Sequence, residues 1–185
     1  MILLLFIKLL SFVSYKPVNS WWYISKFFCY ALLGFIFIKL PIVQPLVESF
    51  CEMLANATYY VTYLFDNSVK IQKTVIFRKS AYAVDVSKAC SALGYVVILF
   101  SAILAYPTKL RKKVRLLLEA FLFIQVLNVI RITSLLYARS LLDMQQFNFI
   151  HEQLWIYIFL LAVCSFFIFK VCQFKARRLI NINFL

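Results

Sequence analysis

The chain has 185 residues, of which 64% are hydrophobic and 18% aromatic, with only 2 Gly and 4 Pro. Soluble domains are closer to half apolar, so this composition excludes a water-soluble globular protein and predicts an all-α integral membrane protein. The formal net charge is +13. The Lys and Arg residues flank apolar runs, where they meet anionic lipid headgroups, and no solvated basic domain exists that could bind nucleic acid.

Two apolar segments begin the chain. Residues 1–13 are apolar but interrupted by Lys8, and no small-x-small cleavage site follows them, so we expect a short or half-spanning helix instead of a signal peptide. Residues 21–39 are long enough to cross a bilayer, and the aromatic residues Trp21, Trp22 and Tyr23 at their start are typical of a membrane interface.

Residues 41–65 predict a weaker span because polar side chains interrupt it. Every fourth position carries one of them: Gln44, Glu48, Glu52 and Asn56. This spacing places them on one stripe of a helix, which faces other helices or water and not lipid. An ordinary polar face buried in the helix bundle is the simplest interpretation.

Residues 66–88 form the only substantial hydrophilic segment. Residues 74–77 and 82–86 are rich in β-formers, with Arg78 and two further polar residues between them. We therefore expect a small extracytoplasmic β-hairpin that leads the chain to Cys90.

The last three spans alternate with two basic clusters. We expect spans over residues 90–106, 114–137 and 151–169, with Pro107 ending the first and an outer loop at 141–149. The basic residues follow the first and the last span: Lys109, Arg111, Lys112, Lys113, Arg115, then Lys170, Lys175, Arg177, Arg178. Because positive residues accumulate on the cytoplasmic side, both clusters are predicted inside. Counting backwards gives six transmembrane helices with both termini inside if residues 1–13 span the membrane, and five helices if they do not, in a single domain over residues 1–185.

Five cysteines are present, and the predicted topology separates one from the others. Cys29, Cys51 and Cys164 fall within spans, and Cys172 lies near the cytoplasmic end. Each of these four cysteines is explained as a small buried hydrophobic residue. Only Cys90 lies at the outer boundary, as an exposed thiol at a helix N-terminus whose unpaired amides favour the thiolate. No second cysteine lies at that depth, so we expect no disulfide. Taken alone, Cys90 is better explained as a structural residue than as a catalytic one.

Arg131 lies inside a predicted span, where a guanidinium costs about 3 kcal/mol or more and therefore faces a cavity or a partner. Gln125, Asn128 and Arg131 recur every three residues, which predicts a polar stripe directed into the bundle, deepest at Gln125. The alternative explanation for Arg131 is a structural ion pair with one of three glutamates: Glu48, Glu52 or Glu152.

His151 is the only histidine of the chain and stands at the outer start of the last span. Histidine suits proton transfer near neutral pH, although an interfacial polar residue that ends a loop is the alternative explanation. A single histidine argues against a zinc site, and we expect no metal and no cofactor.

The predicted topology brings Cys90, Arg131 and His151 to the same membrane face. Cysteine and histidine are the minimum for thiol acyl transfer, in which the base takes the thiol proton and later supplies one to the leaving amine. A nearby arginine can stabilise the developing oxyanion.

Three motifs carry a resemblance to a known family. The segment Ala-Cys-Ser-Ala at residues 89–92, the segment Asn-Val-Ile-Arg-Ile at 128–132 and Phe-Ile-His at 149–151 resemble the exosortase/archaeosortase family. That family has an Ala-Cys-Ser-Gly-like segment, an Asn-x-x-Arg segment and a late His, in this order on successive helices. The resemblance covers roughly residues 70–170, and the chain looks like a short member. Ala92 stands where the family usually has Gly.

The resemblance implies a function and a location. Family members are multi-helix membrane proteins proposed to act as cysteine transpeptidases (thiol proteases) on C-terminal sorting signals of the PEP-CTERM type. It implies Cys90 as nucleophile, Arg131 as oxyanion stabiliser, His151 as general acid and base, and Asn128 in support. It also implies a bacterial inner-membrane protein whose site faces the periplasm or exterior. The substrates would be membrane-tethered proteins with a short polar motif, an apolar helix and a basic tail.

Two other hypotheses stay open. A non-catalytic transport or assembly subunit could use the polar stripe for packing, although a transporter is expected to show internal symmetry or Gly/Pro-broken helices. A thiol-disulfide enzyme would need a second outer cysteine or a Cys-x-x-Cys motif, and the sequence has neither.

Overall fold

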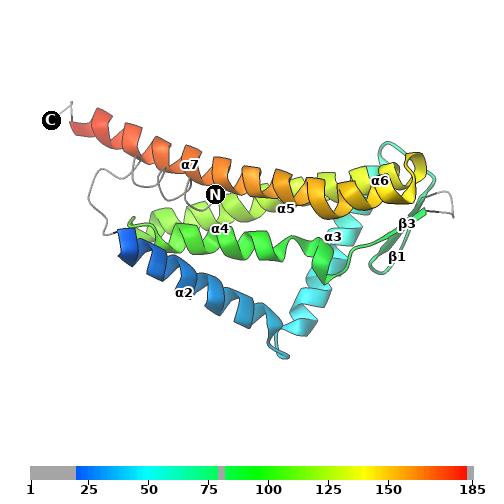
Figure 1. The fold of residues 1–185 in the computed structure, drawn as a ribbon, viewed down its shortest axis with the longest axis horizontal. Coiled ribbons are helices and arrows are strands. Elements are labelled where there is room, and N and C mark those ends of the chain that lie inside the picture. Colours follow the sequence, from blue (N-terminus) through cyan, green and yellow to red (C-terminus); the bar gives the residue numbers. More distant parts are fainter. Residues whose placement is uncertain (1–19, 79–81, 183–185) are drawn as a thin grey trace.

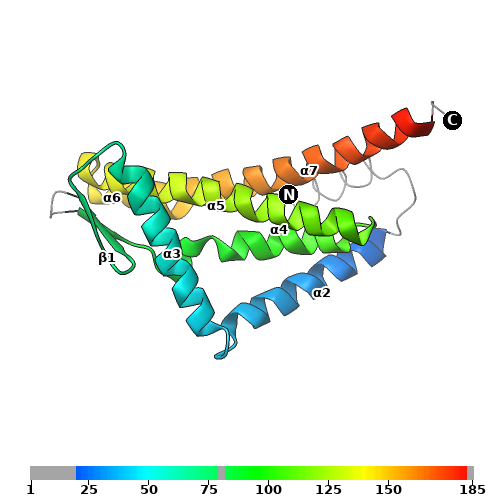
Figure 2. The same cartoon turned by 180° about the vertical axis from the view of Figure 1, so that it is seen from behind.

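A computed structural model describes residues 20–78 and 82–182, so the predicted first helix at residues 1–13 lies outside the described residues. The elements follow in this order: α2 (Ser20–Lys39), α3 (Gln44–Tyr63), β1 (Val69–Gln72), β2 (Val75–Arg78), β3 (Tyr82–Asp85), η1 (Lys88–Ser91), α4 (Leu93–Ala105), α5 (Leu110–Leu141), α6 (Met144–Phe149), η2 (Ile150–Leu154) and α7 (Trp155–Ile182). Helices α4, α5 and α7 run along the long axis, and the sheet lies at one end of it (Figures 1 and 2).

Three helices in the described part are long and apolar enough to cross a membrane: Trp21–Lys39, Leu110–Arg139 and Met144–Gln173. They confirm the predicted spans at 21–39, 114–137 and 151–169. The predicted span at 90–106 is instead the 13-residue helix α4, which ends just before Pro107 as expected. At about 1.5 Å per residue, α4 is too short to cross a bilayer core about 30 Å thick by itself. The predicted total of five to six transmembrane helices is therefore not confirmed.

Helix α2 lies antiparallel to α4. Near its start, the Tyr23 hydroxyl donates a 3.3 Å hydrogen bond to the carbonyl of Ala102, which lies near the end of α4. Farther along, Gly34 packs so tightly on Val97 that a Cβ at Gly34 would lie 2.7 Å from that side chain. Helix α2 therefore runs from the end where α5 begins towards the end that carries Cys90. This direction is opposite to the predicted one, which assumed that residues 41–65 cross the membrane.

Helix α3 is amphipathic and crosses obliquely from the end of α2 to the sheet (Figures 1 and 2). The residues on its buried face are not those of the predicted polar stripe. They are Val47, Cys51, Leu54, Ala55, Thr58 and Thr62. Glu48, Glu52 and Asn56 are exposed, so the expectation of a stripe buried in the bundle is wrong. Because charged side chains occupy its outer face, α3 is not among the helices apolar enough to span.

The predicted hairpin is confirmed, and a third strand extends it. Strands β2 and β3 pair antiparallel, with Val75 opposite Asp85, and β1 pairs antiparallel with the other edge of β2. Strand β1 was not predicted, although Val-Lys-Ile-Gln alternates apolar and polar residues as a half-buried strand does. Val69, Ile76 and Val84 pack on Ile132 and Leu136 of α5, so the sheet is seated on the end of that helix.

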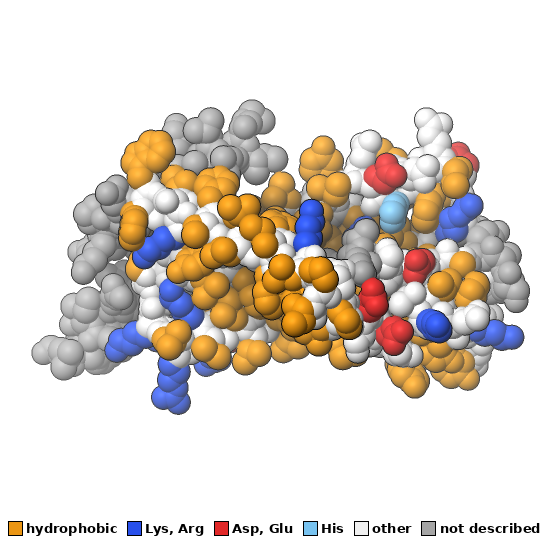
Figure 3. Space-filling view, turned by 90° about the horizontal axis from the view of Figure 1, so that it is seen from below, with side chains coloured by type: hydrophobic (Ala, Val, Ile, Leu, Met, Phe, Trp, Pro, Cys, Tyr) orange, Lys and Arg blue, Asp and Glu red, His pale blue; other side chains and the backbone are white. Residues whose placement is uncertain are grey.

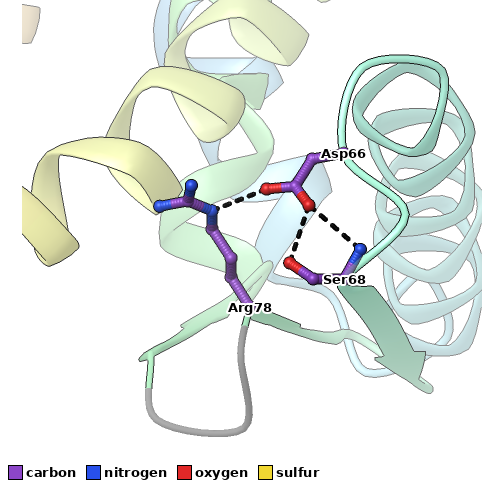
Figure 4. A network of polar contacts seen from close by, with 3 residues as sticks. All are labelled: Asp66, Ser68 and Arg78. Atoms are coloured by element: carbon purple, nitrogen blue, oxygen red, sulfur yellow. Dashed lines mark hydrogen bonds and ion pairs between the residues drawn. The ribbon is translucent and has the colours of Figure 1, made fainter.

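Arg78 ties the sheet to the helices. Its Nε donates a 2.8 Å hydrogen bond to Oδ2 of Asp66, and its guanidinium carbon lies 4.3 Å from the centre of the Tyr137 ring on α5. Figure 4 shows Asp66 held between Arg78 and Ser68. The hydrogen bonds from Arg78 and Ser68 hold the pKa of the Asp66 carboxyl well below its usual range.

Two predicted loops are helical. Helix α5 begins at Leu110, so Arg111, Lys112, Lys113 and Arg115 lie on its first turns and not in a loop. Lys and Arg are good helix formers, which explains why the helix extends through the cluster. The predicted outer loop at 141–149 contains α6, which Asp143 caps by accepting a 2.8 Å hydrogen bond from the backbone N–H of Gln146.

Candidate active site

Cys90 lies in the single turn η1, which connects the sheet to α4. The residue is buried, with 8% of its surface exposed. The prediction of an exposed thiol is therefore wrong. The prediction that Cys90 begins a membrane helix is also wrong, because α4 begins only at Leu93. Among the five cysteines, Cys51 is also buried, whereas Cys29 and Cys172 are exposed.

Ala92 separates η1 from α4 by adopting a left-handed backbone conformation, with φ 55° and ψ 13°. For a residue with a Cβ this conformation costs about 1–2 kcal/mol, whereas Gly adopts it freely. Ala92 is the position at which the family named above usually has Gly. The backbone geometry explains that preference and shows that this chain tolerates the methyl group.

Asn128 joins α5 to the turn that carries Cys90. Its side chain is fully buried, and its Nδ2 donates a 2.8 Å hydrogen bond to the Cys90 carbonyl. The polar stripe of α5 is thus directed into the bundle, as its three-residue spacing predicts.

Arg131 follows Asn128 on the same stripe and is 9% exposed. Its guanidinium carbon lies 5.8 Å from the centre of the Phe159 ring on α7. Within the residues that the structure describes, Arg131 makes no ion pair, and its Nε has no hydrogen-bond partner. The three glutamates considered as its partners are exposed and do not pair with it: Glu48, Glu52 and Glu152. The ion-pair explanation for Arg131 is therefore wrong for this part of the chain.

His151 is half-buried in η2, a π-helical turn inserted between α6 and α7. Its ring stacks on that of Phe147, with centres 5.8 Å apart and planes 5° apart. Single π-turns within helices are found frequently at functional sites. The sequence placed His151 at a helix start but gave no sign of this turn.

The structure brings one pair of the predicted residues into direct contact. Asn128 donates a hydrogen bond to the Cys90 carbonyl, and Arg131 follows Asn128 on the same face of α5. In the described ranges, no hydrogen bond joins the Cys90 thiol to His151 or to Arg131. Catalytic hydrogen bonds are often long in a free enzyme and shorten when substrate binds.

Phe159 lies beside the candidate site residues and was not singled out from the sequence. Its ring stacks on Tyr95 of α4, with centres 4.5 Å apart, and also contacts Trp155 and Arg131. His151, Trp155 and Phe159 recur every four residues, so the helical period could have identified them as one face.

Charge is distributed unevenly along the molecule. On the face drawn in Figure 3, the acidic side chains gather in one half. One acidic residue belongs to the opposite end: Glu119 pairs with Arg115 at 2.8 Å and with Lys170 at 2.7 Å. Among the described residues, no three His, Cys, Asp or Glu side chains are close enough together to hold a metal ion.

The family model described as "Transmembrane exosortase (Exosortase_EpsH)" matches residues 1–169, which include Cys90, Asn128, Arg131 and His151. No curated protein and no solved structure matched the chain significantly. Together with the three long apolar helices, the family match identifies the chain as a membrane protein.

Proposed function

Because the chain belongs to the transmembrane exosortase family, we propose that it is a membrane-embedded cysteine protease or transpeptidase that cleaves C-terminal sorting signals of membrane-tethered proteins. The observation that carries this proposal is the hydrogen bond from Asn128 to the Cys90 carbonyl, because it holds the Asn-x-x-Arg segment of α5 against the cysteine turn. Arg131 then lies buried beside that turn with its charge unpaired in the described part of the chain.

The reaction proceeds by thiol acyl transfer. The Cys90 sulfur attacks the scissile carbonyl carbon, and His151 takes the thiol proton and delivers it to the leaving amine. The C–N bond breaks, and the N-terminal part of the substrate stays on Cys90 as a thioester. Water or an amine then attacks this thioester and releases the product. Arg131 stabilises the oxyanion of both tetrahedral intermediates in a buried environment, where such stabilisation is strongest.

The substrate is a protein already anchored in the bilayer, with a short polar motif, an apolar helix of about 20 residues and a basic cytoplasmic tail. Anchoring raises the effective concentration of the scissile bond, so a short motif suffices for recognition. The enzyme lies in the bacterial inner membrane, with the basic start of α5 inside and η1 facing the periplasm or exterior. This orientation follows the preference of Lys and Arg for the cytoplasmic side.

Co-expression with such a substrate tests the proposal, with processing followed by gel mobility. We expect Cys90→Ala and Cys90→Ser to abolish processing, whereas the matched control Cys164→Ala, on α7, retains it. A substrate that lacks its apolar helix should stay uncut by the active enzyme. Processing by Cys90→Ala at the wild-type rate would refute the enzyme assignment.

A further inference from the structure

The polar stripe of α5 carries hydrogen-bonding atoms that have no partner in the described part of the chain. They are Nε2 and Oε1 of Gln125, Oδ1 of Asn128 and Nε of Arg131, and all are buried. The three residues recur every three positions of one helix, within the candidate span Leu110–Arg139. The unpartnered atoms therefore form one line that runs from Arg131 into the membrane.

Folding does not explain Gln125. Both atoms of its amide are buried without a hydrogen bond, and inside a bilayer there is little water to replace one. An apolar side chain of the same size would avoid this cost. The side chains of Asn128 and Arg131 have roles in the proposed chemistry, but that of Gln125 does not. Its amide therefore needs a partner from outside the described part of the chain.

The chemistry of that partner follows from the amide. A glutamine side chain offers N–H donors and a carbonyl acceptor, which is the complement of one peptide unit. A substrate helix must unwind around its scissile bond to be cut, and the freed N–H and C=O groups then need partners at membrane depth. Gln125 lies about 9 Å deeper than Arg131 along α5. An extended chain that continues inward from the level of Arg131 covers that distance in about three residues.

We propose that Gln125 binds the main chain of the substrate just C-terminal to the scissile bond, where the apolar helix of the substrate is unwound. The proposal rests on the proposed function and adds a substrate-binding residue to it. Oδ1 of Asn128, which lies nearer to Cys90, accepts a hydrogen bond from the same stretch of the substrate main chain. Cys90 is 8% exposed and Arg131 is 9% exposed, so the substrate has to reach a row of residues that is buried in the free protein.

The test compares two substrates that differ in the first turn of the apolar helix. One has Ala and Leu there and forms a helix readily, and the other has two Gly residues and unwinds at lower cost. The variant is Gln125→Met, which keeps the length of the side chain and removes the amide. The matched control is Val126→Leu, which changes the exposed neighbouring position.

Loss of the amide should slow cleavage of the helix-forming substrate about tenfold, since one or two hydrogen bonds are lost. The Gly-containing substrate should restore most of that rate. The melting temperature of purified Gln125→Met should equal or exceed that of the wild type, because an unpartnered buried amide is gone. Val126→Leu should match the wild type throughout.

Wild-type rates of Gln125→Met on both substrates would overturn the proposal, since the amide would then bind only water. An equal loss on both substrates with a lowered melting temperature would also overturn it, in favour of a structural role. If Gln125→Met does not fold, the cleavage rates of Gln125→Leu on the two substrates are measured instead. The same two outcomes would overturn the proposal. Cys90→Ala is assayed in parallel, because activity in that variant would refute the proposed function itself and not the role of Gln125 alone.

Discussion

The side-chain amide of Asn128 donates a hydrogen bond of 2.8 Å to the main-chain carbonyl of Cys90, 38 positions away in the sequence. Both residues are buried, so no solvent competes for this contact. The hydrogen bond fixes the turn η1 against α5 and determines where the thiol lies relative to Arg131. We therefore propose that Asn128 positions Cys90.

Asn128→Leu removes the donor and leaves the Cys90 carbonyl without its partner. We expect the free energy of unfolding to fall by about 1–3 kcal/mol and processing to fall with it. The control is Asn56→Leu, since the Asn56 amide also donates to a main-chain carbonyl, that of Glu52, but on an exposed face. Thermal unfolding and processing are measured for both variants. Wild-type processing by Asn128→Leu would show that the contact does not position Cys90.

Arg131→Lys keeps the positive charge and loses the planar fork of donors. We expect processing to fall by about 100-fold or more, which is the usual effect of removing an oxyanion-stabilising donor. Arg139→Lys is the matched control, because Arg139 lies near the end of the same helix and also contacts an aromatic ring, that of Phe147. Initial cleavage rates are compared at equal amounts of inserted protein. If Lys sustains the wild-type rate at position 131, Arg131 acts only as a point charge.

Ala92→Gly relieves the left-handed backbone conformation at the end of η1. The relief is about 1–2 kcal/mol, and the loss of a buried methyl group costs about 0.8 kcal/mol. We therefore expect the free energy of unfolding to stay unchanged or to rise by up to about 1 kcal/mol. Ala57→Gly, at an exposed position inside α3, should instead lower it by about 1 kcal/mol. Destabilisation of both variants to the same extent would contradict the assigned conformation of Ala92.

Cysteine labelling tests the direction of α2 and the placement of α3. In a cysteine-free chain, Ile42→Cys and Asn67→Cys should both react with a membrane-impermeant maleimide added to intact spheroplasts. Lys109→Cys should react only after lysis. All three positions are exposed, so access across the membrane decides the result. Protection of Ile42→Cys together with labelling of Asn67→Cys would mean that α3 crosses the membrane after all.

Local periodicity predicted much of this structure. Runs of apolar residues were sufficient to predict α2, α5 and α7. The β-formers on both sides of Arg78 were sufficient to predict the hairpin. The three-residue spacing of Gln125, Asn128 and Arg131 correctly predicted a stripe directed into the bundle, because a helix converts spacing into a face.

Packing between distant segments was not predictable in the same way. The spacing of Glu48 and Glu52 identified a stripe but not its environment, which depends on where α3 lies relative to the bundle. The direction of α2 depends on that same placement. Cys90 is buried in a turn that ends at the left-handed Ala92, and single-residue backbone conformations leave little trace in composition. The π-turn at His151 is equally invisible, since its residues suit an α-helix.

The proposed mechanism requires that Cys90 forms a thioester with the N-terminal part of a cleaved substrate. Enzyme mixed with substrate is quenched in acid within the first turnover, digested and measured by mass spectrometry. We expect the peptide containing Cys90 to gain the mass of the acyl fragment and neutral hydroxylamine to remove it. Cleavage without any adduct on Cys90, or with the adduct on Cys51 or Cys164, would rule out Cys90 as the nucleophile.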